Sequence, residues 1–203
     1  REYTEQKTDL ASLPKAQVLA DAGRRVMEYA DTVLGGTENK SARFAWLLSR
    51  LVATCGGLLW QVVRELAQSR FVPVAFELPI GSPNGEPEEA GVEPLVLTLP
   101  DGARIRVQGQ VDRVDVYQKD GISYVRVVDY KTGHKEFRLD EVVEGINLQM
   151  LIYILSICQN GGPHIGEKPP HDLQENSPIQ PAGVLYLPAR LPVVRVERGA
   201  QGE

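Results

Sequence analysis

The chain has 203 residues, of which 42% are hydrophobic and 24% are charged, and its formal net charge is −5. This composition is typical of a globular domain, and the acidic balance argues against indiscriminate affinity for nucleic acid. No apolar run approaches the roughly 20 residues that span a bilayer, and no signal peptide opens the chain. Cys55 and Cys158 lack metal-site spacing and suit buried thiols in a reducing compartment. We therefore expect a cytoplasmic protein without membrane contact.

Periodicity predicts helices and strands in a definite order. Apolar positions at helical spacing indicate one helix over residues 14–33 and a second that begins at Asn39 or Ser41 and ends near Ser69. The expected segments after these helices are a strand at 71–80, a loop at 81–94, strands at 95–99, 103–118 and 122–131, a helix over 140–159, a loop at 160–180 and a strand at 182–188.

This order predicts an α/β (α+β) layered domain in which helices cover a sheet. Residues 1–70 would form a helical segment that packs on a core of residues 71–203. We expect a single domain overall, and one that is a piece of a larger protein.

Two of the strands are joined at Asp120-Gly121, a dipeptide typical of two-residue type I′ hairpin loops. With that loop, Lys119 pairs with Ile122, and Asp112 lies opposite Asp129. Directly opposed residues share one face of a sheet, with Cβ atoms about 5 Å apart. The hairpin therefore brings two carboxylates together.

Two opposed carboxylates repel each other unless a shared proton, a basic side chain or a divalent cation offsets their charge. Lys131 lies two residues beyond Asp129 and so emerges on the same face. Carboxylate oxygens suit Mg²⁺ or Mn²⁺, and such a cation generates a hydroxide nucleophile and stabilises charge on a phosphate. Lys131 would stabilise developing negative charge or orient the attacking water. A surface cluster of salt bridges on a hairpin is the alternative interpretation.

Three ordered motifs, GQVDRVD, VVDYKTG and GINLQMLIY, resemble the pattern of the PD-(D/E)XK nuclease superfamily. The similarity is greatest to the C-terminal nuclease domain of the AddB-type chain of bacterial ATP-dependent helicase/nucleases, with the RecB-type nuclease as a cousin. The resemblance assigns Asp112 to the first motif, Asp129 and Lys131 to the second, and Gln149 and Tyr153 to the third. It implies a restriction-endonuclease-like fold with a mixed central sheet flanked by helices.

The resemblance also implies a function. It indicates a metal-dependent DNA exonuclease that acts on DNA ends in double-strand-break repair and recombination, with a helicase subunit as partner. Asp112, Asp129 and the backbone of Tyr130 would hold Mg²⁺ or Mn²⁺. Gln149 and Tyr153 are four residues apart, share one helical face, and would reach toward the carboxylates or the DNA backbone.

Further sequence features bear on this interpretation. Residues 102–138 hold eight basic and five acidic side chains, which suits a phosphate-bearing substrate. Glu77 weakly matches another family acid, although a salt bridge at a strand edge is the simpler expectation for it.

The chain also departs from the family. Members of this family usually carry a histidine on a helix before the region of the motifs, and often clustered cysteines near the end that hold an iron–sulfur cluster. In this chain no histidine precedes His134 and no cysteine cluster follows, so an iron–sulfur cluster is not supported. We expect a weak or inactive nuclease when this chain stands alone. A noncatalytic DNA-binding or scaffold module that keeps the fold is the alternative function.

Overall fold

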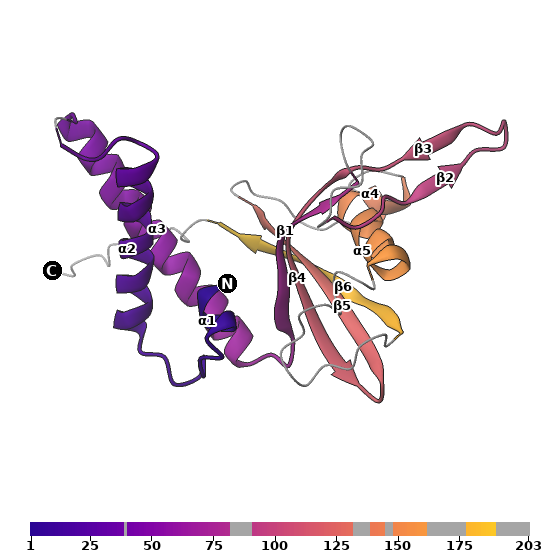
Figure 1. Ribbon diagram of the computed structural model, residues 1–203, viewed down its shortest axis with the longest axis horizontal. Helices are drawn as coiled ribbons and strands as arrows, with labels where there is room; N and C mark the ends of the chain where they lie inside the picture. The colour runs from indigo at the N-terminus through magenta and orange to yellow at the C-terminus, as the bar shows by residue number, and fades with distance from the viewer. Residues whose placement is uncertain (39, 82–90, 132–138, 145–147, 162–177, 190–203) are drawn as a thin grey trace, which may run out of the picture.

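A computed structural model describes residues 1–38, 40–81, 91–131, 139–144, 148–161 and 178–189. Its helices and sheet form three layers (Figure 1). Helices α1 (Glu2–Glu5), α2 (Lys15–Thr32) and α3 (Ala42–Ala67) lie on one side of the central sheet, and α5 (Gln149–Asn160) lies on the other. The order of helices and strands follows the one that periodicity predicts, with a short additional helix, α1, at the start, and with one predicted strand and one predicted helix each divided in two.

The central sheet has four strands in the order β1 (Val72–Ile80), β4 (Gly109–Lys119), β5 (Ile122–Lys131) and β6 (Ile179–Pro188). The β1–β4 and β4–β5 pairs are antiparallel, whereas β5 and β6 are parallel. The sheet is therefore mixed, and the predicted fold class is confirmed. The last strand begins three residues earlier than expected.

The β4–β5 hairpin has the predicted loop and register. Asp120 and Gly121 have φ values of 52° and 76°, and positive values at both positions define a type I′ turn. Lys119 pairs with Ile122, and the ladder runs from there to the pair formed by Arg113 and Val128. The ladder ends there, one position before Asp112 and Asp129, which the same register would place opposite each other.

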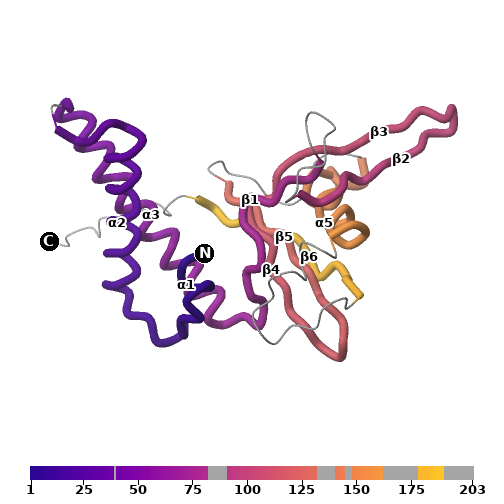
Figure 2. Tube along the Cα trace, viewed as in Figure 1, coloured from indigo at the N-terminus to yellow at the C-terminus, as the bar shows by residue number. Residues whose placement is uncertain are grey.

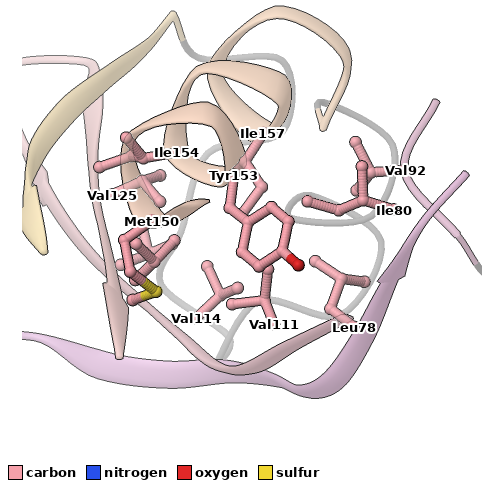
Figure 3. Close-up of a cluster of buried hydrophobic side chains, with 12 residues drawn as sticks. Leu78, Ile80, Val92, Val111, Val114, Val125, Met150, Tyr153, Ile154 and Ile157 are labelled. Carbon is pink, nitrogen blue, oxygen red and sulfur yellow. The ribbon is translucent and has the colours of Figure 1, made fainter. Parts of the chain in front are cut away.

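A single apolar cluster joins one face of the sheet to α5. Tyr153 of α5 lies against Val111 and Leu78 of the strands in this cluster (Figure 3). Its buried members are Leu78, Ile80, Val92, Val111, Val114, Val116, Val125, Val127, Met150, Tyr153, Ile154 and Ile157. Burying each large apolar side chain contributes about 1.5–3 kcal/mol, so α5 is held firmly beside the ends of β4 and β5.

The predicted strand at 103–118 is two strands. β3 (Arg104–Arg106) pairs with β2 (Val96–Thr98) in a separate two-stranded sheet, whereas β4 starts at Gly109 and pairs with β1. The chain thus exchanges one partner strand for another between residues 106 and 109. Alternation of side chains continues through such an exchange, so the sequence pattern did not reveal it. The β2–β3 hairpin projects away from the central sheet (Figures 1 and 2).

The single helix predicted over residues 140–159 is also two helices, α4 (Leu139–Val143) and α5. Gly145 and Asn147, which are weak helix formers, fall between them in sequence. Some of the predicted segments lie outside the described residues. These are residues 82–90 of the first expected loop, 162–177 of the second, 145–147 between the two helices, and His134.

Helices α2 and α3 form an antiparallel pair that extends beyond the sheet (Figure 1). The Ser41 hydroxyl accepts the backbone N–H of Phe44 at 3.2 Å, so it caps α3 as expected. Gly56 permits close packing, because a Cβ at that position would lie 2.8 Å from the Leu19 side chain of α2. Cys55 of α3 is a free, half-buried thiol.

By length and composition alone, α3 is long and apolar enough to cross a membrane, which is weak evidence because core helices of soluble proteins pass the same test. The expectation of no membrane contact therefore stays a prediction.

Candidate functional site

The first predicted acid is fixed against the neighbouring strand. The Asp112 carboxylate, through Oδ2, accepts the backbone N–H of Tyr130 at 2.7 Å. The backbone ladder between β4 and β5 ends at the pair Arg113–Val128. Beyond that pair, the Asp112 side chain, rather than a backbone carbonyl of β4, accepts this N–H of β5. This contact holds the Asp112 carboxylate beside the residue that directly follows Asp129.

The second acid is buried and paired. Asp129 is 8% exposed, and the Lys131 ammonium lies 2.9 Å from its Oδ1 and 2.7 Å from its Oδ2. No hydrogen bond from a described residue is assigned to Oδ2, although the Lys131 ammonium beside it offsets part of its charge. A carboxylate oxygen in this position would also suit a bound divalent cation.

Lys131 is held in its charged form. Its hydrogen bond to Asp129 raises the pKa of Lys131 above the ordinary value; desolvation opposes that effect, and the negative charge of Asp129 adds to it. The side chain is therefore an ammonium at neutral pH. It can donate hydrogen bonds and stabilise negative charge, but it cannot accept a proton from water.

Tyr130 contributes to the site through its backbone. Its hydroxyl lies on the opposite face of the sheet, where it accepts a hydrogen bond from Arg113 at 2.9 Å. Burial raises the pKa of Tyr130, and the Arg113 charge opposes that rise. Only the main chain of Tyr130 is available for the metal-binding role that the sequence suggests.

The two residues of the third motif lie together on α5. Gln149 donates from Nε2 to the Tyr153 hydroxyl at 3.0 Å. Tyr153 is buried whereas Gln149 is exposed, so the pair links the core to the surface at the first turn of the helix. Within the described residues, no hydrogen bond joins this pair to Asp112, Asp129 or Lys131.

Gly109 is the glycine of the first motif, and its contact with Tyr153 explains why this position has no side chain. A Cβ at Gly109 would lie 1.9 Å from the Tyr153 hydroxyl oxygen and 2.6 Å from its Cζ. The first and third motifs are therefore in direct contact, across a position where only glycine fits. The sequence contains this glycine within the motif, but its spacing alone does not reveal the contact with Tyr153.

Glu77 occupies the neighbouring strand at the same level. It falls between the pairs Phe76–Arg113 and Leu78–Val111, so its position on β1 corresponds to Asp112 on β4. Its φ is 52°, a left-handed value that costs a non-glycine residue about 1 kcal/mol or more. Glu77 is exposed, and the expected salt bridge is not found between it and any described residue.

The three acids do not converge. Among the residues that the structure describes, no three His, Cys, Asp or Glu side chains are placed to hold a metal ion together. Asp112 and Asp129 stay the predicted pair of cation ligands, with water and main-chain oxygen as further ligands.

Sequence reasoning missed Tyr186 of β6. This residue pairs with Asp129 across the parallel β5–β6 ladder, and paired residues share a face of the sheet. Burial and the Asp129 charge raise the pKa of Tyr186, whereas Lys131 lowers it. The pairing is between strands 57 residues apart in sequence, and no local pattern indicates it.

Some of the basic residues counted in the sequence are not available to a phosphate. Arg113 is 1% exposed and donates to Asp115 at 2.7 and 2.9 Å. Arg126 donates to Asp115 at 2.8 Å and lies 2.7 Å from Glu65 of α3. This network occupies the opposite face from the paired acids, and it connects the helical layer to the sheet.

Comparison with known proteins gives a consistent result. Residues 5–199 match the PD-(D/E)XK nuclease superfamily. The chain is similar to the B subunit of an ATP-dependent helicase/deoxyribonuclease from Thermoanaerobacter sp. (strain X514), with 31% identity over 80% of this chain and 13% of the relative. The same-named protein of Acetivibrio thermocellus is 31% identical over 84% of this chain and 14% of the relative. The same-named protein of Symbiobacterium thermophilum is 34% identical over 75% of this chain and 12% of the relative. The chain thus spans only a small part of the length of these relatives.

Proposed function

Because the chain belongs to the PD-(D/E)XK nuclease superfamily, we propose that it hydrolyses phosphodiester bonds of DNA with a divalent cation held between Asp112 and Asp129. One observation carries the metal: Oδ2 of Asp129 is buried and is assigned no hydrogen bond from a described residue, with the Lys131 ammonium 2.7 Å away as its ion-pair partner. Asp129 lies in the second family motif, next to a fixed Asp112 carboxylate. Carboxylate oxygens of this kind fit Mg²⁺ or Mn²⁺.

A bound Mg²⁺ or Mn²⁺ would supply a Lewis acid and lower the pKa of a coordinated water. The chain contributes the remaining chemistry. The N–H of Tyr130 fixes the Asp112 carboxylate through one oxygen and leaves the other available. The Lys131 ammonium, already protonated, donates to a nonbridging phosphate oxygen and stabilises the charge that develops there.

The third motif has a positioning role in this proposal. Since Gln149 donates to the Tyr153 hydroxyl, the hydroxyl keeps its own proton for an acceptor such as a phosphate oxygen. The exposed Gln149 at the start of α5 would then contact the DNA backbone.

The relatives are named as B subunits of a helicase/deoxyribonuclease. We include in the proposal an exonuclease role on DNA ends during break repair and recombination, with a helicase subunit as partner in the cytoplasm. A noncatalytic DNA-binding module is the second candidate, and one observation favours it: the described residues hold no cluster of three metal-binding side chains.

The experiment that tests the proposal compares Asp129→Asn with Asp120→Asn. Asp120 lies in the loop at the far end of the same hairpin, and asparagine also suits its positive φ, so the charge change is matched. We expect the wild type and Asp120→Asn to bind Mn²⁺ by calorimetry and to degrade linear DNA, if slowly. Asp129→Asn should lose both properties and keep its circular dichroism spectrum.

Unchanged Mn²⁺ binding in Asp129→Asn would remove the proposed metal site. A wild type that binds DNA, but neither binds Mn²⁺ nor cleaves, would instead support the noncatalytic module.

A further inference from the structure

We propose that the β2–β3 hairpin, residues 95–107, is an arm that holds the phosphate backbone of the substrate beside the cleavage site. The inference rests on the proposed function, because it takes DNA as the substrate. Within the described residues, β2 and β3 pair only with each other, and the hairpin projects from the body of the molecule (Figures 1 and 2). An isolated two-stranded hairpin is only marginally stable in water, so a bound partner would stabilise this one.

One face of the arm presents two free positive charges. Arg104 pairs with Thr98 and Arg106 with Val96, so both guanidinium groups emerge on the same face. Both are exposed, and neither has an ion pair or hydrogen bond with a described residue. The acid at the tip, Asp101, accepts the N–H of Ala103 at 2.9 Å and shapes the turn.

The helical layer gives the contrast. Arg24 and Arg25 of α2 are also surface arginines, but each is bonded to carboxylates of Asp21, Glu28 or Glu2 at 2.6–3.4 Å. The charges of Arg24 and Arg25 are thus offset by neighbouring carboxylates. Those of Arg104 and Arg106 are not, which leaves them for an anionic partner.

The spacing of the two arginines fits a phosphate chain. Residues two apart on a strand are about 6.8 Å apart, and successive nucleotides of one strand advance about 3.4 Å along a duplex. Because that advance is measured along the duplex axis, neighbouring phosphates lie farther apart than it, and two guanidinium groups on one face can contact nearby phosphates of one strand. The opposite face exposes Leu97 and Ile105 at 44% and 45%, which gives apolar surface for sugars and base edges.

The arm is also continuous with the candidate site. β3 leads directly into β4, so Arg106 is six residues before Asp112, and Arg104 is eight before it. An extended chain spans at most about 3.6 Å per residue, which limits these separations to about 22 and 29 Å. The arm would therefore contact the backbone within about six to eight nucleotides of the bond to be cleaved.

The test measures DNA affinity by fluorescence anisotropy, using a labelled 30-base-pair duplex with a single-stranded tail in EDTA, which prevents cleavage. We expect Arg104→Gln/Arg106→Gln to weaken binding about tenfold at low salt. The slope of log Kd against log salt concentration should fall by about 1.8, the value for two lost phosphate contacts. The charge-matched control Arg24→Gln/Arg25→Gln should bind as the wild type does, and Arg104→Lys/Arg106→Lys should keep the wild-type slope.

An unchanged affinity and salt slope in the Gln double variant would overturn the arm, even if the wild type cleaves DNA. Wild-type DNA binding with the predicted slope change, but without metal-dependent cleavage, would support the arm and refute the catalytic proposal. The two failures are therefore distinguishable.

Discussion

At the scale of single residues, Lys131 links structure to mechanism most directly. Because it is protonated and bonded to Asp129, its role is to supply charge, which matters more in the transition state than in substrate binding. We expect Lys131→Ala to reduce cleavage by about 100-fold or more with nearly unchanged DNA affinity. Single-turnover cleavage and anisotropy check this, and Lys119→Ala, at the other end of the hairpin, should leave both quantities unchanged.

The same ion pair predicts a pH dependence. The pKa of Lys131 is raised above 10.5 in the folded state, so the stability that the pair contributes is complete below that value and is lost as pH rises through the folded pKa. Unfolding measured by denaturant between pH 8 and 11 should show a loss at the alkaline end. The loss should be smaller in Lys131→Ala. If the wild type and Lys131→Ala lost the same free energy of unfolding at alkaline pH, then the ion pair would not be the source of that loss.

Gly109 gives a prediction about packing. Adding a methyl group there places it against Tyr153, so Gly109→Ala should destabilise the fold by about 1–3 kcal/mol, the usual cost of overpacking. Chemical denaturation of the wild type and the variant measures this difference in the free energy of unfolding. In the double variant Gly109→Ala/Tyr153→Leu, the smaller side chain should recover part of the loss, whereas additive losses would show that the two residues do not meet.

At the scale of elements, the network of buried charges attaches α3 to the sheet. Asp115 is fully buried and accepts hydrogen bonds from Arg113 and Arg126. Removing one partner of a buried ion pair leaves an uncompensated charge and costs about 3–5 kcal/mol. We therefore expect a loss of this size for Asp115→Asn in urea unfolding. The control Glu28→Gln, from an exposed pair on α2, should cost at most about 1 kcal/mol.

Elements also show what the sequence could predict. The Asp120-Gly121 loop fixed the register of β4 and β5, because turn chemistry is local. The long helices were equally predictable from their apolar periodicity. The end of β3 and the pairing of Asp129 with Tyr186 depend on which distant strand lies alongside, and no local pattern carries that information.

Some features of the candidate site could likewise be predicted from the sequence, whereas others depend on the tertiary structure. Its acids and lysine lie on adjacent strands joined by a tight turn, so sequence alone could predict that they lie near one another. The availability of Arg104 and Arg106, in contrast to the burial of Arg113, follows from which face of which sheet each occupies. Charge counting along the chain treats these arginines alike, and it therefore overestimated the positive surface around the site.

At the scale of the whole molecule, the described residues form two apolar clusters of unequal size, one between the sheet and α5 and one among the helices. The cluster between the sheet and α5 has twelve buried residues. The cluster among the helices of the other layer has three, Leu13, Val18 and Val63. Because stability follows buried apolar surface, the α1–α3 layer should open at a lower free energy than the sheet and α5, as a separate cooperative unit.

Hydrogen exchange read by mass spectrometry tests this difference, with Val18→Ala and Val125→Ala as matched truncations of fully buried valines. Each removes the same two methyl groups, which costs about 2 kcal/mol in a well-packed core. Val18→Ala should speed exchange in α1–α3 and leave β4 and β5 protected, since the smaller cluster can open alone. Val125→Ala should speed exchange in the strands and in α5 through global unfolding. If both variants speed exchange equally throughout the described residues, then the charge network around Asp115 couples the layers so tightly that the chain unfolds as one unit.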